Sequence, residues 1–173
     1  MTANHRKVVA RYLDGKLVKG YTFDFGPSQP RFHIFAQPSA SGASTQVFLR
    51  DLKALFFVRD FAGDPARQDV QKFPPGDTAG AHVEVRFRDG ELMVGTVEGS
   101  TKDTPGFFLV PADQGSNNLR VYVLTAATRV VYPLPSFARS AMGSPGRQSV
   151  SQPTGPPAAP PLLPGRVLAW LAR

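Results

Sequence analysis

The chain has 173 residues, of which 42% are hydrophobic and 10% aromatic, and it contains no cysteine. This composition is typical of a globular protein and excludes global disorder, while the lack of cysteine excludes disulfides and thiolate metal sites. No stretch approaches the roughly 20 apolar residues of a membrane-spanning helix, and the N-terminal segment lacks the apolar run of a secretory signal. We therefore expect a cytoplasmic protein.

The positive charge is unevenly distributed along the chain. The formal net charge is +7, and residues 1–60 contribute +5 of it, from nine basic and four acidic side chains. Residues 61–80 and 81–134 contribute −1 each, and residues 135–173 contribute +4 from four arginines with no acidic residue. A basic surface attracts anionic partners, and we expect such a surface in residues 1–60.

The sequence of Lys7–Phe35 recurs as His82–Val110, 75 residues later. The shared elements pair Asp14-Gly15 with Asp89-Gly90, Gly20 with Gly95, and Pro30 with Pro105. After a slip of one residue, Val47-Phe48-Leu49 corresponds to Val121-Tyr122-Val123, and Phe56-Phe57-Val58 to Val130-Val131-Tyr132. A repeated unit of about 55 residues is long enough to be a small domain, so the repeat predicts two tandem domains.

Each unit has the pattern of five short strands. Val83, Val85 and Phe87 alternate with polar residues, as in a strand with one buried face. The Asp-Gly pairs predict tight turns, and Gly20 and Gly95 predict a sharp bend or a close approach in the second strand. A single 3₁₀ turn is expected before the last strand of each unit. The expected strands are 8–12, 17–23, 31–35, 46–50 and 55–58, and 83–87, 92–97, 106–110, 120–124 and 129–132.

These patterns predict an all-β protein of two tandem small SH3-like or Sm-like β-barrels with a disordered C-terminal tail. The first barrel is expected over residues 5–60, a linker over 61–80 and the second barrel over 81–134. Residues 135–173 are rich in Pro, Gly, Ser and Ala and show no periodic apolar face, which predicts disorder.

The first unit is similar to the Sm-like branch of small barrels. Tyr12–Gly15 with Gly20, and then Val47–Asp51, resemble the two motifs of that family. The resemblance implies a five-stranded barrel. The RNA-binding residues of the family, an Asp-x-x-x-Asn loop and an Arg-Gly pair, are not matched, because Asp24 is followed by Phe-Gly-Pro-Ser and Arg50 by an aspartate.

Residues 5–134 resemble a bacterial family of uncharacterised domains. The resemblance lies in the segments Phe56–Phe61, Pro105–Asp113 and Ser116–Val121. It implies a protein that is found together with signalling modules and has no established activity.

No grouping of residues predicts catalysis or metal binding. His5, His33 and His82 do not have metal-ligand spacing, and the chain has no nucleophile motif, zinc-protease motif or phosphate-binding glycine loop. We therefore expect no enzymatic activity, no catalytic residue, no metal and no cofactor.

Two groups of residues are candidates for ligand binding. Asn117, Asn118 and Arg120 could read a base edge or grip a phosphate; alternatively, the asparagines adopt turn geometry and Arg120 points outward from a strand. Phe57 or Phe61 is expected to pack on the other barrel or the linker, because neighbours on a strand face opposite sides, or to form an exposed stacking platform. The basic residues Arg11, Lys16, Lys19, Arg31 and Arg59 of the first unit are further binding candidates.

The features together predict a non-enzymatic protein-interaction or signalling-scaffold module. One alternative is the binding of RNA or single-stranded DNA through the basic first barrel and the tail. A second alternative is a sensor of a small anionic ligand or nucleotide held between the barrels. The oligomeric state is left open.

Overall fold

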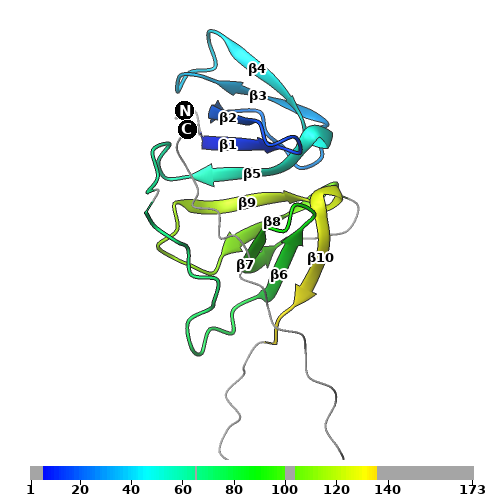
Figure 1. The fold of residues 1–173 in the computed structure, drawn as a ribbon. Coiled ribbons are helices and arrows are strands. Elements are labelled where there is room, and N and C mark those ends of the chain that lie inside the picture. The colour runs from blue at the N-terminus through cyan, green and yellow to red at the C-terminus, as the bar shows by residue number, and fades with distance from the viewer. Residues whose placement is uncertain (1–5, 65, 100–103, 136–173) are drawn as a thin grey trace, which may run out of the picture.

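The computed structural model describes residues 6–64, 66–99 and 104–135, and this part of the chain consists of strands, two one-turn 3₁₀ helices and loops (Figure 1). The first half contains β1 (Arg6–Tyr12), β2 (Leu17–Thr22), β3 (Arg31–Phe35), β4 (Ser44–Phe48), η1 (Leu49–Asp51) and β5 (Leu52–Val58). The second half contains β6 (Ala81–Phe87), β7 (Leu92–Glu98), β8 (Gly106–Pro111), β9 (Asn118–Leu124), η2 (Thr125–Ala127) and β10 (Thr128–Pro133).

The all-β class and several local predictions are confirmed. A 3₁₀ turn precedes the last strand of each half, and the Asp-Gly turns place Gly15 and Gly90 at φ values of 89° and 87°. No helix of the described residues is long and apolar enough to cross a membrane. The predicted disorder of residues 135–173 falls, beyond residue 135, outside the described residues.

All ten strands of the described residues belong to one antiparallel sheet, so the prediction of two closed barrels is wrong. The strand order is β10-β6-β7-β8-β9-β5-β1-β2-β3-β4, and the first and last strands do not pair. In Figure 1 the strands follow this order from β4 at the top to β10 at the lower right. The reason is that β5 pairs with β1 along one edge and with β9 along the other, which makes the two halves one continuous sheet.

The two halves have the same strand order, but their alignment differs from the predicted one. Phe32 lies opposite Val47 and Phe107 lies opposite Val123, so Val47 corresponds to Val123 rather than to Val121. The predicted alignment is therefore wrong by two residues in this part of the chain. A shift of two residues keeps every side chain on the same face of a strand, so the apolar pattern does not reveal it.

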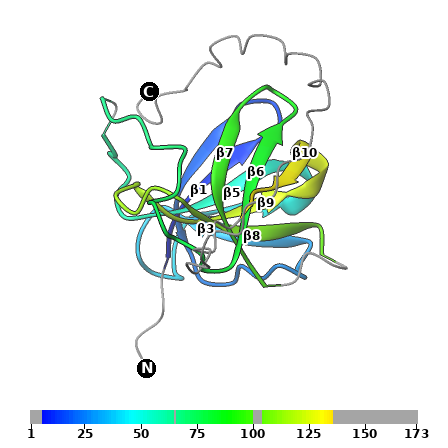
Figure 2. The ribbon, with the colours of Figure 1, turned by 90° about the horizontal axis from the view of Figure 1, so that it is seen from below.

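The cores of the two halves lie on opposite faces of the sheet. Phe57 lies opposite Val8 on one face, whereas its neighbour Phe56 lies opposite Val121 on the other. Val121 in turn lies opposite Leu109, within the core of the second half. Seen from below in Figure 2, β6 and β7 run steeply across the direction of β5 and β9, so the sheet curls as it encloses this second core. All seven residues of β5 are buried because a different core covers each of its faces.

An aromatic cluster strengthens the contact between the halves. The ring of Phe25, in the loop after β2, lies 5.1 Å from Phe32, 5.6 Å from Phe57, 6.3 Å from Phe108 and 5.3 Å from Tyr122, measured between ring centroids. Phe57 also lies 6.2 Å from Phe108. These edge-to-face and tilted contacts are favourable for aromatic rings. The predicted packing of Phe57 against the second half is therefore present.

The glycines of β2 and β7 allow neighbouring strands to approach closely. A Cβ atom added to Gly20 would lie 2.3 Å from the carbonyl oxygen of Phe35, and one added to Gly95 would lie 2.3 Å from that of Val110. Real Cβ atoms do not approach backbone atoms this closely. The close approach of β2 to β3 and of β7 to β8 therefore requires glycine at these two positions. The close approach predicted for these two positions is confirmed.

We predict that Gly95→Ala destabilises the protein, because the methyl group would push β8 away from β7. The expected loss is about 1–3 kcal/mol of unfolding free energy, as for other overpacked sites. Equilibrium denaturation followed by circular dichroism measures it. Gly26→Ala is the control, because its Cβ would meet only the flexible side chain of Gln29, at 3.2 Å. Equal stability of the two variants would contradict the prediction.

Candidate functional site

A group of four charged side chains joins the two halves. Arg11 on β1 and Lys53 on β5 belong to the first half, and Asp89 and Glu91 belong to the turn between β6 and β7. Lys53 Nζ donates to Asp89 at 2.5 Å and also to Glu91, and Arg11 Nη1 donates to Glu91 at 2.8 Å. The side chains of Lys53 and Glu91 are only 5% and 6% exposed. We call these four residues the ionic seam.

The ionic seam removes two cations from the predicted basic surface. Arg11, a predicted binding residue, is held by Glu91, with Asp89 at 4.0 Å. Lys53 was not among the predicted binding residues, although a single charge within the apolar run Leu52–Val58 is a sign of a buried, paired lysine. Desolvation by itself raises the pKa of Asp89, but the hydrogen bonds from Lys53 and the Glu91 amide and the nearby positive charges lower that pKa below its usual value.

We predict that Lys53→Met strongly destabilises the protein, because it leaves the buried Glu91 without its lysine partner. An uncompensated buried charge costs about 3–5 kcal/mol, and because Arg11 still pairs with Glu91 the expected loss lies toward the lower end of this range. The double variant Lys53→Met, Glu91→Leu should recover much of this loss, since apolar residues can replace a buried pair. Chemical denaturation of the two single variants and the double variant measures the coupling. Single variants as stable as the wild type would contradict a buried pair.

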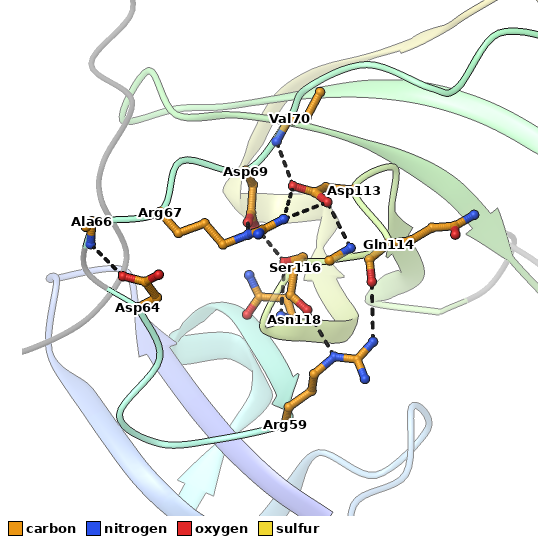
Figure 3. A network of polar contacts seen from close by, with 11 residues as sticks. Arg59, Asp64, Ala66, Arg67, Asp69, Val70, Asp113, Gln114, Ser116 and Asn118 are labelled. Carbon is orange, nitrogen blue, oxygen red and sulfur yellow. Dashed lines mark hydrogen bonds and ion pairs between the residues drawn. The ribbon is translucent and has the colours of Figure 1, made fainter.

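The connector, residues 59–80 between β5 and β6, is attached to the loop that precedes β9 (Figure 3). Arg67 Nη2 donates to both carboxylate oxygens of Asp113, at 3.0 and 2.9 Å, and the amide of Val70 donates to the same group at 2.9 Å. The hydroxyl of Ser116, which is 1% exposed, donates to Asp69 at 2.6 Å. These contacts give the charged residues of this region structural partners within the chain.

Arg59 also donates hydrogen bonds to the loop that precedes β9. Its Nε donates to the carbonyl oxygen of Ser116 at 3.2 Å, and its Nη2 donates to that of Gln114 at 3.4 Å (Figure 3). Its backbone amide donates to the carbonyl oxygen of Asn117 at 3.0 Å. The structure therefore places this predicted binding residue against the loop of the second half.

Asp113 makes the attachment of the connector sensitive to pH. The Val70 amide lowers the pKa of Asp113, partial burial opposes this, and the Gly115 amide and Arg67 lower it further, so that it lies below the usual value. A carboxylate with a depressed folded pKa contributes stability above its unfolded pKa of about 3.9, and the contribution is lost as the pH falls through the folded value.

We predict that acidification from about pH 4 down through the depressed pKa of Asp113 releases the connector and lowers the protection of the Val70 amide, measured as its exchange rate relative to the intrinsic rate at the same pH. Asp113→Asn should show low protection at this amide already at neutral pH, with little further change on acidification. Hydrogen-exchange NMR at several pH values measures this. Asp51→Asn, at an exposed site beside Arg50, is the control and should behave as the wild type. A pH dependence that persists in Asp113→Asn would contradict the assignment.

The predicted site at Asn117, Asn118 and Arg120 is largely occupied by internal contacts. The Asn117 side chain accepts from the Asp60 amide at 3.0 Å and donates to the Asp60 carbonyl at 2.9 Å, so it fastens the connector to the loop. The backbone N–H of Asn118 donates to the hydroxyl of Ser116 at 3.0 Å. Arg120 Cζ lies 3.5 Å from the centroid of the Phe108 ring, and its Nε lies 2.7 Å from a carboxylate oxygen of Glu98. The side chains of Asn117 and Arg120 thus have partners within the chain, and ligand binding by the three residues stays a prediction.

A row of aromatic rings lies on the outer side of the first half. Tyr21 on β2 lies 5.3 Å from Phe61 of the connector and is the register partner of Phe35 on β3, which lies 5.5 Å from Phe23. All four rings are partly exposed. Tyr21 lies opposite Lys7 and so points away from the core that contains Val8. We call Lys7, Lys19, Tyr21, Phe23, Phe35 and Phe61 the outer aromatic face.

Two lysines border the rings. Lys7 Nζ donates to the carbonyl oxygen of Arg59 at 3.1 Å and lies 5.9 Å from the Phe61 ring centroid, and Lys19 Nζ donates to the Phe61 carbonyl at 3.3 Å. Neither ammonium group forms an ion pair within the described part of the chain. Phe61 and Lys19 were predicted binding residues, whereas Lys7 and Tyr21 were missed. The alternation of Leu17, Lys19 and Tyr21 was the available signal, because it puts all three on one face.

The remaining predicted residues do not gather into one site. Lys16 is exposed at the β1–β2 turn, with its Nζ 5.5 Å from the ring centroid of Tyr12. Arg31 is exposed on β3, opposite Phe48 of the edge strand. Phe57 is 5% exposed and therefore belongs to the core rather than to a stacking platform. The outer aromatic face thus unites only part of the predicted set.

The structure also has a small pocket in the first half. Its volume is about 170 Å³, and it is lined by Arg6, Thr22, Phe23 and Phe25. Pockets for drug-sized ligands span about 300–1,000 Å³, so this one is too small to enclose a nucleotide. All four lining residues belong to the first half, whereas the predicted small-ligand site was expected between the two halves. Within the described residues, no three His, Asp or Glu side chains are grouped so that they could hold a metal ion.

The sequence model of a family of unknown function, DUF6982, matches residues 4–134. The chain belongs to this family. The DUF6982 match covers both halves and all ten strands of the described residues, including the ionic seam and the outer aromatic face. The chain matches none of the curated proteins and none of the solved structures with which it was compared. The predicted membership of an uncharacterised family is confirmed, while its bacterial and signalling context stays a prediction.

Proposed function

We propose that this protein is a non-enzymatic, cytoplasmic protein-interaction module that binds its partner through the outer aromatic face. The observation that carries the proposal is the row of partly exposed rings on the first half, in which Tyr21 points away from the core that contains Val8 and Phe61 also packs against the buried apolar cluster. The solvent side of an antiparallel sheet is ordinarily polar. Aromatic side chains on such a surface supply the anchors that dominate the energy of protein interfaces.

The geometry of the rings suits a preformed binding surface. Tyr21 and Phe61 are held edge to face at an interplanar angle of 88°, and Phe23 and Phe35 at 76°. Lys7 and Lys19 fix the connector carbonyls beside the rings. A surface that is already ordered loses little conformational entropy on binding. The partner expected here has an apolar patch and acidic residues, the latter placed near the two lysines, which form no ion pair within the described part of the chain.

The distribution of charge favours a protein partner over a nucleic acid. Binding to a phosphate backbone requires several accessible cations along one path. Arg11 and Lys53 are neutralised in the ionic seam, and Arg59 is bound to carbonyl oxygens of the second half. The outer aromatic face retains only two lysines beside four rings. Its composition is therefore more apolar than a single-strand binding groove requires.

We predict that Lys19→Glu and Tyr21→Ala each reduce partner capture from a lysate of the source organism at least tenfold. Tyr132→Ala is the matched control, because this ring is 46% exposed on β10, at the far end of the sheet. The control should leave capture unchanged, and thermal melting should show that all variants are folded. Quantitative mass spectrometry of the captured proteins measures the effect.

Two outcomes would overturn the proposal. One is equal capture of the same proteins by the wild type and both outer-face variants. The other is tight binding of a single-stranded oligonucleotide, with an affinity that falls steeply with salt and is lost in Lys19→Glu. The second outcome would assign the same surface to nucleic acid.

A further inference from the structure

The sheet ends in two unpaired edges, and the outward backbone groups of β4 can be assigned. The strand order leaves β4 and β10 with one neighbour each. The Leu49 amide donates to the carbonyl oxygen of Pro30, so residue 49 is turned toward β3. Because the direction of backbone groups alternates along an antiparallel strand, the amides and carbonyls of Ser44, Gln46 and Phe48 point away from the sheet.

The β10 edge is blocked in a way that the β4 edge is not. The Leu134 amide donates to the His82 carbonyl oxygen at 2.8 Å, which turns residue 133 outward. That residue is a proline and has no N–H group, and Arg129 adds a charge at the irregular start of the strand. Proline and charge are the common means of protecting an edge strand from pairing. The segment Ser44–Phe48 contains neither proline nor a charged residue.

The second half contains an equivalent strand edge that is already paired with another strand. β9 has the place in the second half that β4 has in the first, since both follow the third strand of their half and precede a 3₁₀ turn. The outer edge of β9 is covered antiparallel by β5, from Ala54↔Val123 to Val58↔Asn118. The corresponding edge of β4 therefore has the geometry to accept an extended segment in the same orientation.

The side chains beside the β4 edge indicate the charge of that segment. Phe48 is partly exposed, lies opposite Arg31, and has Arg50 Cζ at 5.1 Å from its ring centroid. Arg31 forms no ion pair in the described part of the chain, and Arg50 has only the exposed Asp51, at 3.7 Å. An acidic side chain on an added strand next to Phe48 would meet two arginines.

A second copy of the chain does not supply such a strand. Its unpaired edges are β4, which has no charged residue, and β10, which carries Arg129 and Pro133. Neither brings an acidic residue to Arg31 and Arg50, and β10 lacks a donor at residue 133. The occupant favoured by the charge is thus a segment of a different protein.

We propose that the β4 edge binds an extended acidic segment of a partner protein by antiparallel strand addition. The backbone of the segment pairs with Ser44, Gln46 and Phe48, and an acidic side chain pairs with Arg31 and Arg50. Main-chain hydrogen bonds supply the affinity in this mode, and the side chains supply the selectivity. The inference rests on the proposed protein-binding role and gives it a second surface, which meets the outer aromatic face where Phe35 lies opposite Ser44.

The test uses a display library of random eight-residue peptides selected on the full chain. The expected result is a set of extended peptides with Asp or Glu at one constant position, which slow hydrogen exchange at the amides of Ser44, Gln46 and Phe48. Gln46→Pro removes an outward amide and should weaken binding at least tenfold, whereas Gln46→Ala keeps the amide and should bind as the wild type. Ser44→Pro is the second variant, in case the first does not fold.

The charge pairing has its own variant. Arg31→Glu with Arg50→Glu should change the selected peptides from acidic to basic while leaving the protected amides the same. Peptides that bind Gln46→Pro as well as Gln46→Ala, or a dimer of the chain that Gln46→Pro dissociates, would overturn the inference. Lys19→Glu should not affect these peptides, so a failure of the edge and a failure of the outer aromatic face are distinguishable.

Discussion

The pairing of β5 with β9 joins the two halves and sets the surroundings of every buried group between them. β5 is bonded along both edges and buried on both faces, with Phe56 in one core and Phe57 in the other. Burial of a lysine in this strand requires counter-charges nearby, and Asp89 and Glu91 of the second half provide them. Each half therefore contributes to the core of the other half and supplies counter-charges for its buried groups. The chain accordingly forms one continuous sheet and not the two separate barrels that were predicted.

The same pairing decides how the charge of the chain is used. Residues 1–60 are strongly basic in composition, yet Arg11 and Lys53 are neutralised at the seam and Arg59 is bound to the loop before β9. Net charge by sequence segment is thus a poor guide to the surface here. The accessible cations include a pair of lysines beside four rings and, at β4, two arginines beside one ring.

The differences between the halves follow from their places in the sheet. The fourth strand of the second half is covered by β5, whereas its counterpart β4 is an open edge. The outward edge of β10 is protected by Pro133, but β4 has no such protection. The outer aromatic face leads across β3 to this same edge. Both proposed contact surfaces accordingly lie in the first half, between β1 and the edge strand β4.

The strands, the Asp-Gly turns, the 3₁₀ turns and the two close-approach glycines could be predicted from the sequence, because each depends on local conformational preferences and on period-two alternation. Phe57, Phe61 and Lys19 were also among the residues that it singled out. The sharing of one sheet by the two halves, the pairing of Lys53 with Glu91 and the attachment of the connector by Asn117 became visible only in the folded chain. These depend on which strand edges meet, and pairing between residues far apart in the chain leaves no periodic signal in either segment.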